Sequence, residues 1–324
     1  MKRESFGSRL GFILVSAGCA IGIGNVWKFP YICGAYGGAA FILIYLCFLV
    51  ILGIPVLVAE FAVGRGSHTS VAKCFDKLAP AGSGWKPLKF IGIIGCYMLM
   101  MFYTTVGGWM IYYCVKSLRG DFVGATPEAV TQSFSDMLGN APTMMLWMVI
   151  ICLIGFAVCF MGLQNGIEKI SKVMMSALLI IMVILAVHSV MMEGAGEGIS
   201  FYLIPDFQKI KEAGVGNVVF AALSQSFFTL SIGIGAMLIF GSYLDKSRSL
   251  TGEAVSITVL DTFVALTAGF IIIPACFSYG IQPDAGPSLI FITLPNIFAK
   301  MSGGALWGSL FFLLSLIHIS EPTR

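Results

Sequence analysis

The chain has 324 residues, of which 58% are hydrophobic and only 11% are charged, and its formal net charge is +3. Soluble domains carry roughly 25% charged residues, so this composition excludes a soluble globular protein. The nine cysteines are scattered through mostly apolar segments without a C-x-x-C pair. This excludes a disulfide framework or a cysteine-rich metal cluster and favours reduced, buried thiols.

Eight apolar segments follow one another along the chain, against a requirement of about 20 residues for a membrane-crossing helix. They cover about 10–35, 39–63, 88–116, 143–162, 170–192, 216–243, 254–280 and 303–317. The first is long enough to remain as a span and has no small-residue cleavage site, so we predict no removable signal peptide. The pattern predicts an all-α, polytopic membrane protein.

The first segment contains a glycine-rich run, Gly18–Pro30, with the sequence G-C-A-I-G-I-G-N-V-W-K-F-P. Each glycine weakens a helix by about 1 kcal/mol. A bilayer does not tolerate unpaired backbone N–H and C=O groups facing lipid. A break at this depth is therefore expected only where it lines a cavity, and there its carbonyls can hold a cation.

The sixth segment carries a similar run, Gln225–Gly235, which places hydroxyls and glycines at membrane depth. Two interrupted spans, five spans apart, are typical of inverted-repeat transporters that bind substrate between half-helices. The alternative for either run alone is close helix packing through small residues. Asp261 lies in the seventh segment, where an ionisable group is costly and functional by default. The alternative to a functional role for Asp261 is a structural one, in which its carboxylate is hydrogen-bonded to the helix backbone.

Lysine and arginine predict the orientation of the chain. With the N-terminus inside, twelve such residues lie on the inner side and six on the outer side. The inner set is Lys2, Arg3, Arg9, Arg65, Lys73, Lys77, Lys86, Lys89, Lys169, Lys172, Lys246 and Arg248, and the outer set is Lys28, Lys116, Arg119, Lys209, Lys211 and Lys300. This two-to-one bias predicts a cytoplasmic N-terminus.

The eighth segment begins as an apolar helix at Gly304 and stops after roughly a dozen residues, too few to cross a bilayer. We therefore expect a C-terminally truncated protein. Residues 1–315 would form a single, partial transporter domain, and residues 316–324 would be a non-native tail.

Four motifs resemble the neurotransmitter:sodium symporter family, and specifically its bacterial amino-acid transporter branch. They are Arg9–Tyr31, Gly53–Arg65, Ser224–Gly235 and Leu260–Gly269. The resemblance runs from Arg3 to about Leu314. It implies a LeuT-type inverted repeat with broken helices 1 and 6, containing spans one to seven and the start of span eight, so that the second repeat is incomplete.

The resemblance also implies two sodium sites. The first would use the Ala20 carbonyl, the Asn25 side chain, Thr229 and Asp261, with the substrate carboxylate completing the shell. The second would use the carbonyls of Gly18 and Ile21. Its remaining ligands fall by position near His318, Glu321 and Pro322, which do not match the family pattern, so we expect this second site to be incomplete.

The resemblance implies a substrate pocket at the first break, where Gly22 has no side chain, with mostly apolar walls. Gly22 replaces the acidic residue of the monoamine carriers, which leaves room for a carboxylate-bearing substrate. Tyr103 would offer its phenol to that carboxylate, with an ordinary buried tyrosine as the alternative. The predicted substrate is a hydrophobic or aromatic amino acid, held by Gly22, Ile23, Gly24, Leu99, Tyr103, Phe228, Thr229, Ser231 and Ile234.

The same resemblance implies gating residues on both sides. Lys28 and Gln225 would form part of the outer gate, and Arg3 and Tyr243 part of the inner gate. The alternatives are snorkelling to the headgroups for Lys28 and a topology charge for Arg3. Glu60 would accept hydrogen bonds from the backbone of the broken sixth helix.

The predicted function is import of an amino acid driven by Na⁺ through alternating access, in the cell membrane, without an enzymatic step or an organic cofactor. Many relatives have Asn where this chain has Asp261 and need chloride, so a fixed carboxylate predicts chloride-independent transport. The alternatives are an ion channel, a receptor-like sensing homologue and an inactive truncated fragment. A receptor-like homologue would keep the pocket but lose the coupling ions. The presence of the implied sodium ligands Asn25, Thr229 and Asp261 argues against it.

Overall fold

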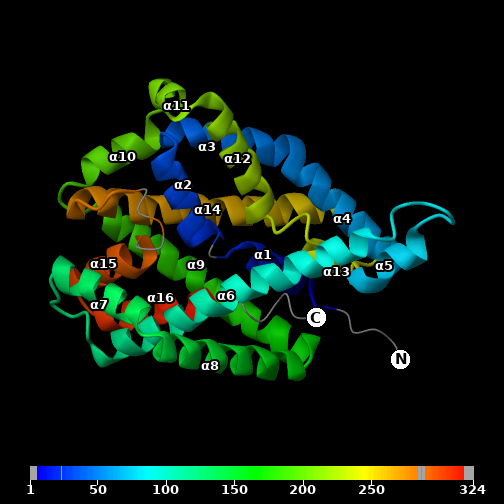
Figure 1. The fold of residues 1–324 in the computed structure, drawn as a ribbon, viewed down its shortest axis with the longest axis horizontal. Helices are drawn as coiled ribbons and strands as arrows, with labels where there is room; N and C mark the ends of the chain where they lie inside the picture. The colour runs from blue at the N-terminus through cyan, green and yellow to red at the C-terminus, as the bar shows by residue number, and fades with distance from the viewer. Residues whose placement is uncertain (1–5, 23, 284–285, 287–288, 317–324) are drawn as a thin grey trace.

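The computed structural model describes residues 6–22, 24–283, 286 and 289–316. These residues form helices joined by turns and short loops, and no strand occurs among them (Figure 1). In chain order the helices are α1 (Arg9–Ala20), η1 (Gly24–Lys28), α2 (Phe29–Ala35), α3 (Ala39–Phe48), η2 (Leu49–Gly53), α4 (Ile54–Ser67), α5 (Val71–Leu78), α6 (Leu88–Arg119), α7 (Pro127–Gly139), α8 (Ala141–Phe160), η3 (Leu163–Glu168), α9 (Lys169–Val190), α10 (Ala195–Leu203), α11 (Phe207–Ala213), α12 (Val215–Thr229), α13 (Ala236–Gly241), α14 (Leu250–Tyr279), η4 (Leu289–Thr293), α15 (Leu294–Lys300) and α16 (Gly304–Leu314).

Within the described part of the chain, five helices are long and apolar enough to cross a membrane. They are Ala39–Ser67, Leu88–Arg119, Ala141–Phe160, Gly166–Val190 and Leu250–Tyr279. A sixth candidate is the pair Arg9–Ala20 and Gly24–Ala35, whose two helices are bent by 53°. These correspond to the first five predicted spans and the seventh. The eighth predicted segment is the short helix α16.

The sixth predicted span is divided into α12 and α13, as the glycine and hydroxyl run indicates. Between them Ser231 (φ 52°), Gly233 (φ 90°) and Gly235 (φ 81°) have left-handed backbone conformations. Glycine adopts this region without a steric penalty, whereas the Cβ atom of Ser231 makes it sterically unfavourable there. These left-handed residues end the helical path after α12 and separate it from α13.

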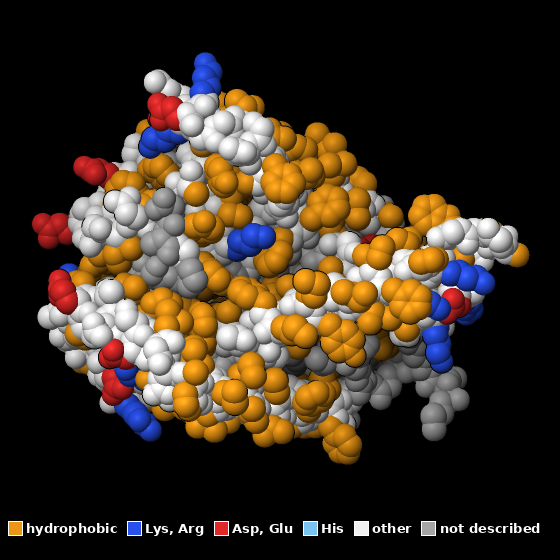
Figure 2. All heavy atoms as spheres, viewed as in Figure 1, with side chains coloured by type: hydrophobic (Ala, Val, Ile, Leu, Met, Phe, Trp, Pro, Cys, Tyr) orange, Lys and Arg blue, Asp and Glu red, His pale blue; other side chains and the backbone are white. Residues whose placement is uncertain are grey.

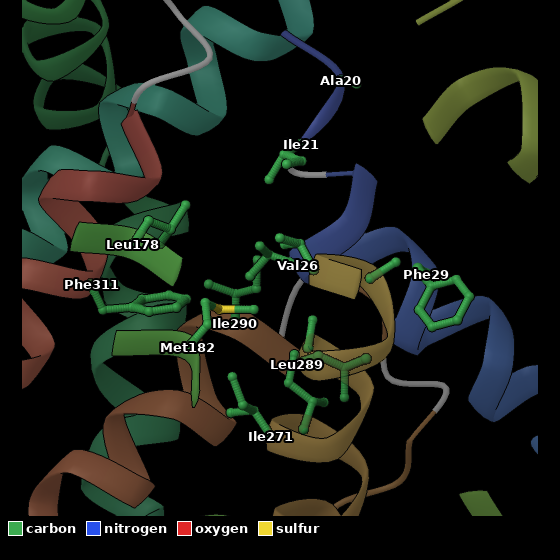
Figure 3. Packing of buried hydrophobic residues seen from close by; sticks show 14 of the residues in the cluster. Ala20, Ile21, Val26, Phe29, Leu178, Met182, Ile271, Leu289, Ile290 and Phe311 are labelled. Atoms are coloured by element: carbon green, nitrogen blue, oxygen red, sulfur yellow. The ribbon is translucent and has the colours of Figure 1, made fainter. Parts of the chain in front are cut away.

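The core is built around the long helix α14, which crosses the middle of the molecule, whereas α8 lies at its edge (Figure 1). In the most apolar window of each span, 61% of the α14 residues are buried but only 11% of those of α8. Figure 3 shows how α9, α14, η4 and α16 pack together beside the first break. The buried side chains that meet there include Val26, Leu178, Met182, Ile271, Leu289, Ile290 and Phe311.

Apolar side chains cover most of the face shown in Figure 2, and charged ones gather mainly towards the two ends of the long axis. On α6, Tyr97, Met98 and Met101 are each about two-thirds exposed, at 67%, 68% and 71%. Such a surface would be unfavourable in water, but it matches the apolar interior of a bilayer. The chain is a multi-pass membrane protein.

Helices α4 and α13 cross at two glycines. A Cβ atom on Gly241 would lie 2.6 Å from the Cα and 2.7 Å from the carbonyl oxygen of Phe61. A Cβ on Gly64 would meet the carbonyl oxygen of Leu238. Both neighbours are backbone atoms and cannot rotate away, so this crossing requires glycine on each helix.

We therefore expect Gly241→Ala to lower stability by about 1–3 kcal/mol, because overpacking forces the two backbones apart. The matched control is Gly216→Ala on α12, where an added Cβ meets nothing within 4 Å. Thermal unfolding of both detergent-solubilised variants measures the difference. Equal melting temperatures for Gly241→Ala and the unaltered protein would contradict the close crossing.

Candidate functional site

The first break separates α1 from η1. Helix α1 ends at Ala20, and Ile21 leaves the helical conformation with ψ 88° while its N–H still donates to the Ala17 carbonyl. The last four carbonyls of a helix lack the N–H groups of a following turn, and this end carries partial negative charge. The predicted carbonyl ligands of Gly18, Ala20 and Ile21 all lie at this helix end, where a cation is favoured.

Side-chain hydrogen bonds reach backbone groups at both breaks. Ser231 Oγ donates to the Cys19 carbonyl at 3.1 Å, and Gln225 Nε2 donates to the Gly24 carbonyl at 3.1 Å. In the second break, Glu60 Oε1 accepts the N–H of Gly233 at 2.5 Å. The first two bonds join the broken spans directly to each other. The third is a contact of the kind that the sequence predicts for Glu60.

Asp261 lies on α14 and accepts hydrogen bonds from both broken spans. Asn25 Nδ2 donates to Asp261 Oδ1 at 2.8 Å and to the Asp261 carbonyl at 3.0 Å. Thr229 Oγ1 donates to Asp261 Oδ2 at 2.8 Å. All three residues have 0% exposure. Residues 236 positions apart in the chain thus form one buried polar cluster, which we call the Asp261 cluster (Asn25, Thr229 and Asp261).

The Asn25 side chain has a second role within the break. Its Oδ1 accepts the N–H of Gly22 at 3.2 Å, while its Nδ2 is directed to Asp261. The side chain therefore pairs one backbone N–H that the end of α1 leaves without a helical partner. This contact fixes the loop between α1 and η1 against α14.

Sequence reasoning missed Tyr45 on α3. Its side chain is fully buried, and its hydroxyl lies near Asp261, Thr229 and Thr262 without a hydrogen-bond partner among the described residues. In the sequence it is one aromatic residue in a continuous apolar run, so no local pattern marks it. Only the packing of α3 against the broken spans brings its hydroxyl to the Asp261 cluster.

The predicted pocket residues lie at the two breaks, on the helices next to them and on α6. A Cβ on Gly24 would lie 2.9 Å from the Phe228 ring, and Lys28 Nζ lies 3.6 Å from the centroid of the same ring. Tyr103 is buried on α6, with Leu99 one turn earlier. Ile234 packs against α6, since a Cβ on Gly95 would lie 3.2 Å from its Cγ2. Ile23 is outside the described residues.

Three of the four predicted gating residues, Lys28, Gln225 and Tyr243, lie among the described residues. Lys28 lies over Phe228, whereas Gln225 donates to the Gly24 carbonyl. The Tyr243 ring, predicted for the inner gate, meets the Phe6 ring edge-to-face with centroids 5.8 Å apart. Arg3, and the tail residues His318, Glu321 and Pro322, are outside the described residues.

Comparisons with known proteins agree with this architecture. The model of the sodium:neurotransmitter symporter family matches residues 3–126 and 128–320. An uncharacterized sodium-dependent transporter of Bacillus subtilis is 36% identical over 316 residues, which are 98% of this chain and 68% of the relative. The sodium-dependent serotonin transporter of Drosophila melanogaster is 28% identical, and the match covers 96% of this chain and 56% of that protein.

Among solved structures, the crystal structure of MhsT in complex with L-phenylalanine superimposes with a TM-score of 0.92 at 37% identity. The match covers 99% of this chain and 73% of MhsT. The predicted fold, all-α with interrupted first and sixth spans, is confirmed. On its motifs, its two broken spans and these matches, the chain belongs to the sodium:neurotransmitter symporter family.

Proposed function

We propose that the protein imports an amino acid with a hydrophobic or aromatic side chain, driven by the Na⁺ gradient through alternating access. The observation that carries this proposal is the Asp261 cluster, which joins both broken spans to α14 at a fully buried point. No bond of the substrate is made or broken in such a cycle, so the protein acts as a transporter and not as an enzyme. The inner Lys and Arg excess supports a cytoplasmic N-terminus in the cell membrane.

Na⁺ is a hard cation and takes oxygen ligands, as other hard cations do. The first site would draw on the Asp261 carboxylate, the Thr229 hydroxyl, the Asn25 amide oxygen and the Ala20 carbonyl. A substrate carboxylate would complete the shell, so that ion and substrate each favour binding of the other. Gly18 and Ile21 would contribute carbonyls to a second site.

The first break supports a carboxylate-bearing substrate. Gly22 contributes no side chain, and the half-helix Gly24–Ala35 begins beside it with its positive end. The Tyr103 phenol on α6 would donate to the same carboxylate. Leu99, Phe228 and Ile234 supply apolar walls, and the related MhsT is seen with L-phenylalanine. These features together favour an α-amino acid with a large apolar side chain.

Removal of the Asp261 carboxylate tests the ion coupling. We expect Asp261→Ala to weaken Na⁺-dependent binding of radiolabelled amino acids by about 10-fold or more, because a hydrogen bond to a charged group contributes about 1.5–3 kcal/mol. The matched control is Asp136→Ala, an exposed carboxylate on α7 that bonds only Gln132 among the described residues.

Binding that ignores both Na⁺ and Asp261 would overturn the coupling and favour a receptor-like protein. Na⁺ currents without any bound amino acid would favour a channel.

Tyr103→Phe tests the contact with the substrate carboxylate. We expect the affinity for the amino acid to fall about 10-fold, since one hydrogen bond to a charged group is lost. The affinity for the corresponding amino amide, which lacks the carboxylate, should change little. Tyr97→Phe is the matched control, because Tyr97 lies on the same helix and is 67% exposed. An equal loss for acid and amide would contradict the proposed contact.

The Asp261 carboxylate also predicts transport without chloride, because a fixed negative charge already accompanies the bound Na⁺. Uptake into proteoliposomes should be unchanged when gluconate replaces chloride on both sides. A collapse of uptake in gluconate would contradict this role of Asp261. Asp261→Asn removes the charge but keeps the shape, and should make any remaining uptake depend on chloride.

A further inference from the structure

The inner end of α1 lies between two buried carboxylates that belong to different parts of the fold. Glu168 ends η3, just before α9, and is 3% exposed. Glu253 lies in the first turn of α14 and is 2% exposed. A buried carboxylate needs charged or hydrogen-bonding partners, and in both cases α1 or the residues directly before it supply some of them.

Glu168 contacts the start of α1 through its backbone. Its Oε2 accepts the N–H of Gly7 at 2.9 Å, and its Oε1 lies 3.5 Å from the Ser8 hydroxyl and 2.6 Å from Lys172 Nζ. Ser8 is the N-cap of α1, so this negative charge lies at the positive end of the helix. Gly11 makes the approach possible, because a Cβ there would overlap Glu168 Oε1.

Glu253 holds the same turn from another helix. Its Oε1 accepts Arg9 Nε at 3.0 Å, and Arg248 Nη1 lies 3.8 Å away. Its Oε2 is buried and has no hydrogen-bond partner among the described residues. Glu253 is therefore stabilised by cations on one oxygen only.

Of the two cations beside these carboxylates, only Arg9 belongs to α1, because Lys172 lies on α9 four residues after Glu168. Both cations reach water. The side chain of Arg9 is 55% exposed, and that of Lys172 is 33% exposed, whereas their carboxylate partners are 3% and 4% exposed. If α1 moved away, both carboxylates would become hydrated and neither cation would be stranded in an apolar environment. This asymmetry allows the contacts to separate without leaving a buried charge, in contrast to a fully buried ion pair.

Helix α1 is also suited to move as a unit. It has 12 residues, and the break at its other end disconnects it from α2 with a bend of 53°. Two polar attachments at that end are the bonds of Cys19 to Ser231 and of Gly22 to Asn25. The inner end is held by Glu168 and Glu253 and by apolar packing of the buried Phe12, whose ring contacts Phe6 and Phe61.

We propose that Glu168 and Glu253 form a two-sided latch (Glu168, Glu253 and their partners Gly7, Arg9 and Lys172) that keeps the inner end of α1 closed against α9 and α14. The inner side opens when both carboxylates release the first turn of α1. Each carboxylate holds the turn in part when the other is lost, so the loss of both contacts has a larger effect than the two single losses combined.

Hydrogen–deuterium exchange of the full chain in detergent tests the latch, with the peptide covering residues 6–15 as the readout. We expect Glu168→Gln and Glu253→Gln each to speed exchange there, and the double variant to speed it by more than the product of the two single effects, about 10-fold or more in total. The matched control is Asp76→Asn, a carboxylate paired with Lys89 away from α1. Peptides from the middle of α14 should keep their protection.

Two results would overturn the proposal. One is unchanged exchange at residues 6–15 in the double variant. The other is an equal loss of protection in α9 and α14, which would mean that the carboxylates support the whole fold and do not specifically hold α1.

Gly11→Ala provides an independent test that keeps both carboxylates. Alanine favours a helix over glycine, so without the close contact this change should slow exchange in α1. If Glu168 closes on Gly11 as described, the added methyl displaces the carboxylate and exchange at residues 6–15 should instead rise. Gly216→Ala, at an open position, is the control. Slower exchange in Gly11→Ala would contradict the latch.

Discussion

A bilayer does not hydrogen-bond to backbone, and this constraint governs the structure around its two broken spans. Each interruption frees N–H and C=O groups that must find partners inside the protein. The chain supplies such partners from side chains: Asn25 for Gly22, Glu60 for Gly233 and Ser231 for Cys19. Asn25 is both a proposed sodium ligand and a partner of freed backbone, so the same amide oxygen serves the fold and the proposed site.

Much of this could be predicted from the sequence, because the signals are local and unusual. Glycine runs inside apolar segments identify both breaks, and Asp261 stands out as an acid in the middle of a span. The bilayer restricts what such residues can do, so a short pattern carries a strong expectation. The roles of the individual site residues remain predictions, and Arg3 and Ile23 lie outside the described residues.

Other features were hidden because they depend on which helices meet. Tyr45 is an ordinary aromatic residue in its segment and becomes notable only where α3 packs against α12. No local pattern in the sequence marks Glu168 or Glu253, and their burial follows from the packing of α1 against α9 and α14. Only the structure shows that a carboxylate fills the space beside Gly11.

The direct bonds between the two breaks have a consequence for evolution of the chain. Ser231 and Gln225 belong to the sixth span, but the carbonyls they serve belong to the first. Every residue at positions 19 and 24 supplies a backbone carbonyl, so the requirement for these bonds falls on the side chains of Ser231 and Gln225, more than 200 positions away in the chain. Because Ser231 also adopts a left-handed conformation that glycine would enter more easily, its retention would mean that selection favours the bond over the relief of strain.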